Sequence, residues 1–288
     1  MQLLVTKIFR AYSKRLRAAG FDQCLDLHDK VRSRMLRLLN PTRRFVSWPN
    51  RTFIDDLKIM LGLRGYEAPA PTSDLFHRAV EDLVGRSLPR GRMRYYPGPD
   101  DGERAKQLLA DAGVDARRAL IGVAPGANWA TKRWPPEYFQ ELVARLIGEG
   151  YQVALQGGPG ERELSRQIAG EHLNQGAFDF CGVSLAEMAA LIQNCTACVT
   201  NDSAPMHLSR ALGVPTLAIF GSTDPNMFEY EDQGLAYIEG LECSPCSFYG
   251  RKACPQSHFR CMRDQTPARI HELLQPLLDG RPRPYPHA

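Results

Sequence analysis

Short apolar runs alternate with amphipathic segments from about residue 119 to residue 225. The apolar runs predict strands, and the amphipathic segments between them, several with proline in the first turn and glycine at the end, predict helices. The expected strands span 120–126, 151–158, 177–182, 197–200 and 216–220. The expected helices span 135–150, 161–172, 184–195 and 206–212. This regular alternation predicts an α/β fold with a parallel, doubly wound sheet.

The pattern upstream of residue 115 is less regular. It predicts helices over 3–19, 31–39, 53–62, 73–84 and 103–112, and strands over 21–29 and 43–48. A doubly wound domain usually has five or six strands, so this part is incomplete by itself. Either the missing strands come from elsewhere or the chain starts late. We therefore expect a partial α/β domain over 1–115 and a second domain over 116–288 that ends in a helix at 267–278.

Composition narrows the class of protein. Hydrophobic residues make up 43% of the chain and charged residues 24%, values typical of a soluble globular protein. The formal net charge of +4 suits an anionic partner but is too small to argue for nucleic acid. No run approaches the roughly 20 apolar residues of a membrane span, and the basic start lacks the core of a signal peptide. We therefore expect a cytoplasmic protein, in which the eight cysteines form no disulfide framework.

The stretch VTNDSAPMHLSRALGVPTLAIFG (199–221) contains a candidate ligand site. It predicts a strand, a turn, a helix with Ser203 as a plausible N-cap, and a second strand. Such a unit places N–H groups and the positive end of a helix at the carboxyl edge of the sheet, which suits a diphosphate. Asp202 and His207 bracket the helix start and can reach a ligand held there. The alternative is an ordinary strand–helix–strand unit with capping residues.

Two more loops are predicted at the same edge. In APGANWATKRWP (124–135), Gly126 allows close approach of a ligand, and Thr131 and Lys132 offer a hydroxyl and a cation. In QGGPGERE (156–163), Glu161 opens the following helix. The alternatives are a solvated Lys-Arg pair and a plain turn with a carboxylate at a positive helix end. Three such loops at one edge together indicate a nucleotide-bearing ligand.

A family resemblance makes this more specific. The segments PGANWATKRWP, GGPGERE, SLAEMAALIQNCTACVTNDSAPMHLSRALGVPTLAIFGSTDP and CSPCSFYGRKACPQSHFRCM occur in the order seen in the ADP-heptose:lipopolysaccharide heptosyltransferases. These enzymes form glycosyltransferase family 9 and have the two-domain GT-B fold. The resemblance covers 119–278 well and extends more faintly through RLRAAGFDQCLDLHDKVRSRML, which looks like part of the acceptor-binding half.

The resemblance implies a function and a donor site. It implies transfer of L-glycero-D-manno-heptose from ADP-heptose to a Kdo-containing lipid A or inner-core acceptor, without a metal or other cofactor and without nucleic acid. It places the reaction in the cytoplasm, at the inner face of the inner membrane.

Thr131 and Lys132 match residues that hold the donor diphosphate and sugar. Glu161 looks like the acidic residue near the ribose, and Val183 like an apolar residue lining the adenine pocket. Asp202, Ser203 and Ala204 match contacts to the donor sugar and phosphates, and His207 the histidine that follows them.

One departure from the family concerns catalysis. Family members begin with a strand and a Gly-Asp loop whose aspartate is the expected general base, which takes the proton of the attacking hydroxyl. No such segment precedes FDQCLDLHD here, so we expect a chain truncated at its start and impaired in catalysis, and the catalytic residue is unassigned. Asp26, His28 and Asp29 are possible substitutes, and a solvated turn at the strand end is the simpler interpretation.

Three further groups have two interpretations each. Cys243, Cys246, Cys254 and Cys261 could bind zinc, although their spacing departs from paired C-x2-C knuckles; packed thiols or local disulfides are the alternatives. Arg32 and Arg34, in a basic stretch of the first part, could face a phosphorylated acceptor or form a solvated helix face. Trp129 or Trp134 could cover the donor or anchor its loop to the core.

Two alternatives to the enzyme remain open at this stage. The chain could be a nucleotide-sugar-binding remnant that folds in its second domain without turnover. It could also be a family member that uses another nucleotide sugar.

Overall fold

The computed structural model describes residues 2–40, 44–47, 70–228 and 233–279. The helices there are α1 (Gln2–Ala19), α2 (Val31–Leu39), α4 (Thr72–Val84), α5 (Pro99–Asp111), α6 (Pro136–Gly148), α7 (Arg162–Ala169), α8 (Leu185–Gln193), α9 (Ala204–Ala211), α10 (Arg260–Arg263) and α11 (Pro267–Leu278). The strands are β1 (Gln23–Asp26), β2 (Arg44–Ser47), β3 (Leu120–Ala124), β4 (Gln152–Leu155), β5 (Ala177–Asp179), β6 (Ala197–Asn201), β7 (Thr216–Ile219) and β8 (Gly234–Ala236). Short 3-10 turns are η1 (Ala130–Lys132), η2 (Pro159–Glu161), η3 (Gly170–His172) and η4 (Pro225–Met227).

The chain divides into two compact units. The first is Met1–Gly91 together with a short segment that begins at Asn226, and the second comprises Arg92–Pro225 and the chain that follows that segment. This division lies upstream of the boundary expected at residue 115. Helix α5 packs with α8, and its Ala105 is fully buried against the second unit's core, which is why α5 belongs to the second unit.

The first unit contains a small parallel sheet. Strands β1 and β2 pair in register from Gln23 opposite Arg44 to Asp26 opposite Ser47, and α4 packs on this pair. The helices expected over 3–19, 31–39 and 73–84 are confirmed as α1, α2 and α4. The helix expected over 53–62 lies outside the described residues.

The second unit has one six-stranded sheet in which all neighbouring strands are parallel. The strand order is β5-β4-β3-β6-β7-β8. The chain builds outward from β3 to β5, returns to β6 beside β3, and then builds outward in the other direction. This confirms the predicted doubly wound α/β sheet. The carboxyl ends of β3 and β6 form its topological switch point, where ligands bind in such folds.

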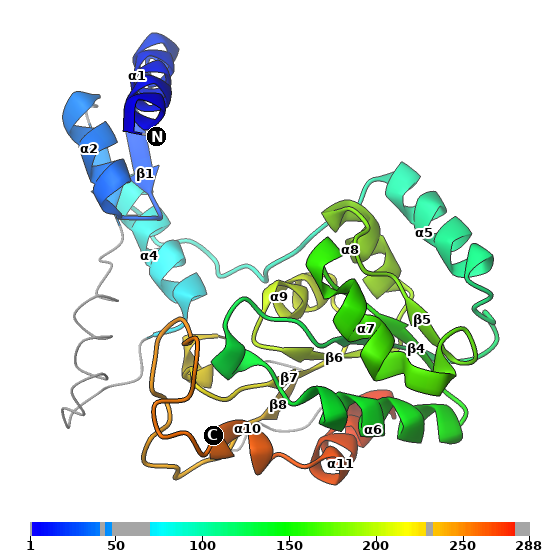
Figure 1. Cartoon of the computed structure of the whole chain (residues 1–288). Coiled ribbons are helices and arrows are strands. Elements are labelled where there is room, and N and C mark those ends of the chain that lie inside the picture. Colours follow the sequence, from blue (N-terminus) through cyan, green and yellow to red (C-terminus); the bar gives the residue numbers. More distant parts are fainter. Residues whose placement is uncertain (1, 41–43, 48–69, 229–232, 280–288) are drawn as a thin grey trace. The chain divides into compact units, whose positions relative to one another are not determined.

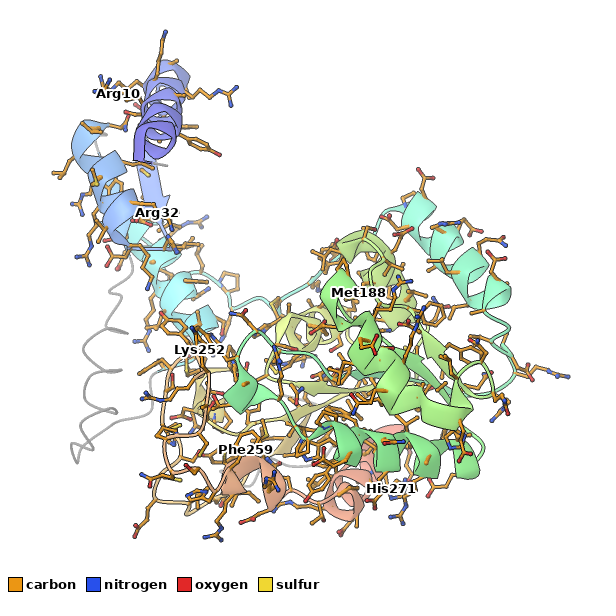
Figure 2. The ribbon with its side chains drawn as sticks, viewed as in Figure 1. Arg10, Arg32, Met188, Lys252, Phe259 and His271 are labelled. Atoms are coloured by element: carbon orange, nitrogen blue, oxygen red, sulfur yellow. The ribbon has the colours of Figure 1, made fainter. Side chains whose placement is uncertain are left out.

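Helices cover both faces of this sheet. One core cluster joins the sheet to α6, α7 and α11, with Phe139, Ile168 and Leu274 fully buried. A second cluster joins it to α5, α8 and α9. Figure 1 shows α6 and α11 on one side of the sheet and α8 and α9 on the other, and Met188 and His271 mark the two sides in Figure 2. Because both faces are covered, only the edges of the sheet remain for a ligand.

Candidate functional site

An ion pair joins the two loops at the switch point. Lys132, in η1 after β3, places its Nζ 2.6 Å from Oδ2 of Asp202, which follows β6. The side chains of Lys132 and Asp202 are 15% and 3% exposed. An ammonium group has three N–H donors, so this pairing leaves donors of Lys132 for an anion that enters from solvent. The sequence predicted both residues as donor ligands, and the structure brings them together.

A second group holds the same carboxylate. The hydroxyl of Thr223, in the loop after β7, donates a hydrogen bond of 2.6 Å to Oδ2 of Asp202. Both residues are buried, so this hydrogen bond forms away from solvent. The position of the Asp202 carboxylate is therefore set by two other elements of the fold.

Asn201 holds both ends of the loop after β3. Its side-chain amide donates to the carbonyl of Pro125 at 2.7 Å and accepts from the backbone N–H of Trp134 at 3.0 Å. Asn201 is fully buried, so these hydrogen bonds form in a low-dielectric interior. In the sequence, Asn201 falls in the turn predicted after strand 197–200, and the pattern gives no sign of these contacts.

Thr131 anchors the η1 turn. Its hydroxyl accepts from the backbone N–H of Arg251 at 2.7 Å, lies 3.2 Å from the Arg251 carbonyl and 2.9 Å from the hydroxyl of Ser222. The residue is 2% exposed. The sequence predicted this hydroxyl as a contact of the diphosphate, and in the structure it is hydrogen-bonded to other groups of the protein. These hydrogen bonds fix the turn that carries Lys132.

Glu161 lies between the loops after β3 and β4. Its Oε2 accepts a hydrogen bond of 2.7 Å from the backbone N–H of Gly158. A Cβ on Gly126 would be 1.5 Å from Oε1 of Glu161, and one on Gly157 would be 2.5 Å from Oε2. Glycine at 126 and 157 thus makes room for a carboxylate beside the switch point.

Helix α9 begins beside Asp202. Ser203 occupies the N-cap position, as predicted, but its hydroxyl donates to the carbonyl of Asn201 at 3.3 Å and does not cap the helix. Ala204 is exposed and Pro205 follows it in the first turn. The positive end of α9 therefore faces the Lys132–Asp202 pair without a capping bond from the Ser203 side chain.

His207, one turn into α9, is half-buried. Burial lowers the pKa of its imidazole below the usual range, and the nearby cations Arg210 and Lys132 add to this, while Asp202 opposes it. Burial therefore favours the neutral form of this imidazole.

Val183 lies after β5. It is partly buried and packs against the core cluster under α8. The next residue, Ser184, caps α8 by accepting from the backbone N–H of Glu187 at 3.1 Å. Val183 is thus an apolar residue held at a defined place between a strand and a capped helix.

The candidates in the first unit lie on α2 and at the turn after β1. Arg34 is paired with Asp29 at 2.8 Å. Oδ1 of Asp26 accepts from the backbone N–H groups of His28 and Asp29, both at 2.9 Å. This is the strand-end turn that the sequence offered as the simpler interpretation of Asp26, His28 and Asp29. Arg32 is exposed on α2.

The cysteine-rich segment holds no formed metal site. Among the described residues, no three His, Cys, Asp or Glu side chains come together as metal ligands. Cys243, Cys246, Cys254 and Cys261 are free thiols, and burial raises the pKa of Cys261 to about 12. A bound metal deprotonates the thiols that ligate it, so the raised pKa does not decide between the interpretations. The metal site and the packed thiols both stay predictions.

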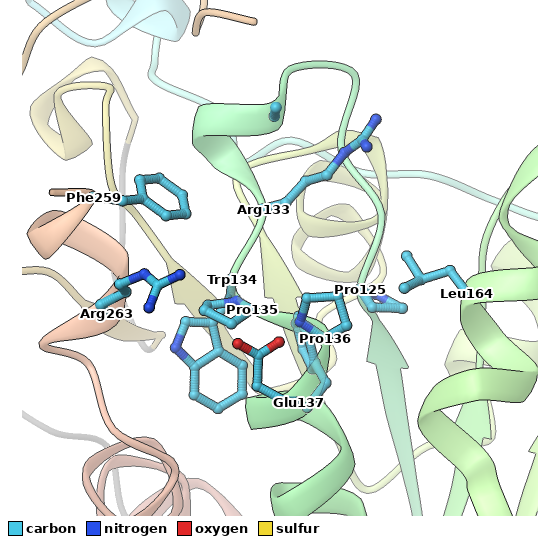
Figure 3. A pocket seen from close by; sticks show the side chains of 11 residues that line it. Pro125, Arg133, Trp134, Pro135, Pro136, Glu137, Leu164, Phe259 and Arg263 are labelled. Carbon is cyan, nitrogen blue, oxygen red and sulfur yellow. The ribbon is translucent and has the colours of Figure 1, made fainter. Parts of the chain in front are cut away.

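A cavity of about 310 Å³ lies at the start of α6. In Figure 3, Trp134, Pro136 and Glu137 face it from one side, and Phe259 and Arg263 from the other. Its lining contains neither Lys132 nor Asp202. Trp134 is 1% exposed, and its indole N–H donates to the carbonyl of Gln265 at 2.7 Å. Trp134 therefore anchors the loop after β3 to the core.

Comparison with known proteins gives a consistent result. The sequence model of glycosyltransferase family 9 (heptosyltransferase) matches residues 9–254. Lipopolysaccharide heptosyltransferase 2 of Salmonella typhimurium is 32% identical over 224 residues, which are 71% of this chain and 63% of that protein. The chain thus spans less than two thirds of that relative.

Two solved structures share the fold. The structure of E. coli ADP-heptose lps heptosyltransferase II superposes with a TM-score of 0.69 at 23% identity, over 94% of this chain and 81% of that one. An E. coli heptosyltransferase solved with ADP-2-deoxy-2-fluoro heptose gives 0.64 at 19% identity, over 94% and 77% of the two chains. These matches confirm the predicted GT-B fold class. None of the helices in the described part of this chain is long and apolar enough to cross a bilayer.

Proposed function

Because the chain belongs to glycosyltransferase family 9, the heptosyltransferases, we propose that it transfers heptose from ADP-heptose to the inner core of lipopolysaccharide. The observation that carries the proposal is the Lys132–Asp202 pair at the switch point of the sheet, beside the start of α9. The Salmonella relative is a lipopolysaccharide heptosyltransferase, which supports heptose as the sugar, and the E. coli heptosyltransferase of the same fold was solved with an ADP-linked fluoroheptose.

The proposed donor site uses residues that follow β3, β4, β5 and β6. The ammonium of Lys132 and the backbone N–H groups of Ser203 and Ala204, at the start of α9, hold the diphosphate. Asp202, fixed by Thr223, faces the sugar. Glu161 reaches the ribose hydroxyls, and Val183 lines the adenine pocket. Ser203 and Ala204 contribute backbone groups, and His207 lies next to them.

The chemistry follows from these charges. As the bond between the anomeric carbon and the diphosphate breaks, negative charge grows on the departing ADP. A fixed ammonium and the positive end of a helix stabilise that charge without reorganisation. The acceptor hydroxyl must lose a proton as it attacks, and we assign that step to no residue described here. The proposed acceptor, a Kdo-containing lipid of the inner leaflet, places the reaction at the cytoplasmic face of the inner membrane.

A second candidate function is binding of the nucleotide sugar without turnover. It is favoured by the turn after β1, where the carboxylate of Asp26, a possible base, accepts hydrogen bonds from the backbone N–H groups of His28 and Asp29. Both candidates require ADP-heptose to bind at the same loops. They differ only in whether the sugar is transferred.

A transfer assay separates the candidates. The chain, and a version extended by the coding sequence upstream of Met1, are incubated with ADP-heptose and Kdo-lipid A, and the acceptor is followed by mass spectrometry. The enzyme proposal predicts release of ADP and a gain of one heptose by the acceptor. Binding of ADP-heptose by both versions without any product would support the binding function. Tight binding of a UDP- or GDP-sugar in place of ADP-heptose would contradict both.

A further inference from the structure

The segment Cys246–Arg251 lies against the turn that carries Lys132. The backbone N–H of Thr131 donates to the carbonyl of Arg251 at 3.1 Å, and the backbone N–H of Arg251 returns a bond of 2.7 Å to the Thr131 hydroxyl. Figure 2 shows the stretch that carries Lys252 beside this turn. The contact joins residues 120 positions apart in the sequence, so it forms only when the second unit is folded.

Gly250 is in direct contact with the lysine. A Cβ at Gly250 would lie 2.6 Å from Cβ of Trp129 and 3.0 Å from Cδ of Lys132. Its φ is +103°, a conformation that favours glycine. Glycine therefore avoids both the clash with Trp129 and Lys132 and the strain of a positive φ. Its backbone packs along the aliphatic part of Lys132.

Arg251 fixes the shape of this segment. Its Nε and Nη2 both donate to the carbonyl of Cys246, at 3.0 and 2.7 Å. The hydroxyl of Ser247 accepts from the backbone N–H of Gly250 at 3.0 Å. The backbone N–H groups of Cys246 and Ser247 donate to the carbonyl of Ser222 at 3.0 and 3.1 Å. The segment is thus attached to the loop after β7, which also provides Thr223 to Asp202.

We propose that Gly250 and Arg251 are positioning residues for Lys132, holding its ammonium where it serves both Asp202 and the diphosphate of the donor. A lysine side chain is long and flexible, and anion binding costs entropy because it restricts that side chain. Packing along the aliphatic part of Lys132 restricts it before the anion binds and so lowers this cost. The inference rests on the proposed function, since it assumes that Lys132 binds the diphosphate.

The test is a double-mutant cycle on ADP affinity, measured by calorimetry. Gly250→Ala is combined with Lys132→Ala, because two changes that act through one interaction are not additive. Gly250→Ala is expected to weaken ADP binding about tenfold in the parent chain and less than about twofold when Lys132 is already alanine. The matched control is Gly240→Ala, which also has positive φ, +72°, but no atom within 4 Å of the new Cβ.

Arg251→Ala provides a second route if Gly250→Ala does not fold. It leaves Gly250 in place, removes both bonds to the Cys246 carbonyl, and is expected to weaken ADP binding more than AMP binding. An equal loss for ADP and AMP, an equal loss in both Lys132 backgrounds, or no loss beyond that of Gly240→Ala would overturn the inference. If Lys132→Ala binds ADP like the parent chain, the proposed function itself fails.

Discussion

Lys132→Ala is expected to weaken ADP binding by about 10- to 100-fold, because a charged hydrogen bond to phosphate contributes about 1.5–3 kcal/mol. The lysine side chain is 15% exposed, so it is open to an incoming anion yet partly shielded from water. The loss should be smaller for adenosine, which lacks phosphate. Calorimetric titration of the parent and variant chains with ADP and adenosine measures both effects.

The control for Lys132 is Lys252→Ala. Lys252 is exposed and lies in the segment next to the η1 turn, so it tests whether any nearby positive charge would have the same effect. The variant is expected to bind ADP within about twofold of the parent, since exposed charges act weakly at a distance in salt. Equal losses in the two variants would show that general attraction, and not the buried pair, determines the affinity.

Trp134→Ala is expected to lower the free energy of unfolding by about 3–5 kcal/mol, the usual cost of removing a buried aromatic side chain. The indole ring stands edge-on to Phe139, with ring centroids 4.8 Å apart, and it is 1% exposed. The change also leaves the carbonyl of Gln265 without its donor. Urea denaturation followed by circular dichroism gives the value.

Trp134→Phe separates the two contributions of this residue. It keeps an aromatic ring in the core but removes the N–H donor and part of the buried ring volume. It should cost about 1–3 kcal/mol, which combines an unsatisfied polar group with a small cavity. A Trp134→Ala variant that unfolds within about 1 kcal/mol of the parent would show that the loop after β3 does not depend on this anchor.

Local signals in the sequence were sufficient for the architecture of the second unit. Proline in the first turn of α6 and of α9, and Ser184 before α8, predicted where those helices begin. The apolar runs predicted β3, β4, β6 and β7, because a strand buried on both faces is apolar throughout. The sequence pattern did not predict β8, because this strand has three residues and begins with glycine.

Long-range contacts could not be predicted in the same way. The partners of Asn201 lie 67 and 76 positions away, and Arg251 meets Thr131 across 120 positions. Nothing near these residues in the sequence indicates such partners. For the same reason the sequence predicted the Thr131 hydroxyl as a ligand contact, whereas in the folded unit it is hydrogen-bonded to Arg251 and Ser222.

The central claim is that the switch point between β3 and β6 holds the diphosphate of an activated sugar. A crystal structure of the chain with ADP-heptose tests it most directly. The account predicts diphosphate oxygens at about 3 Å from Nζ of Lys132 and from backbone N–H groups at the start of α9. Density for the nucleotide at another edge of the sheet, or in the cavity beside Phe259, with Lys132 still paired to Asp202 alone, would contradict it.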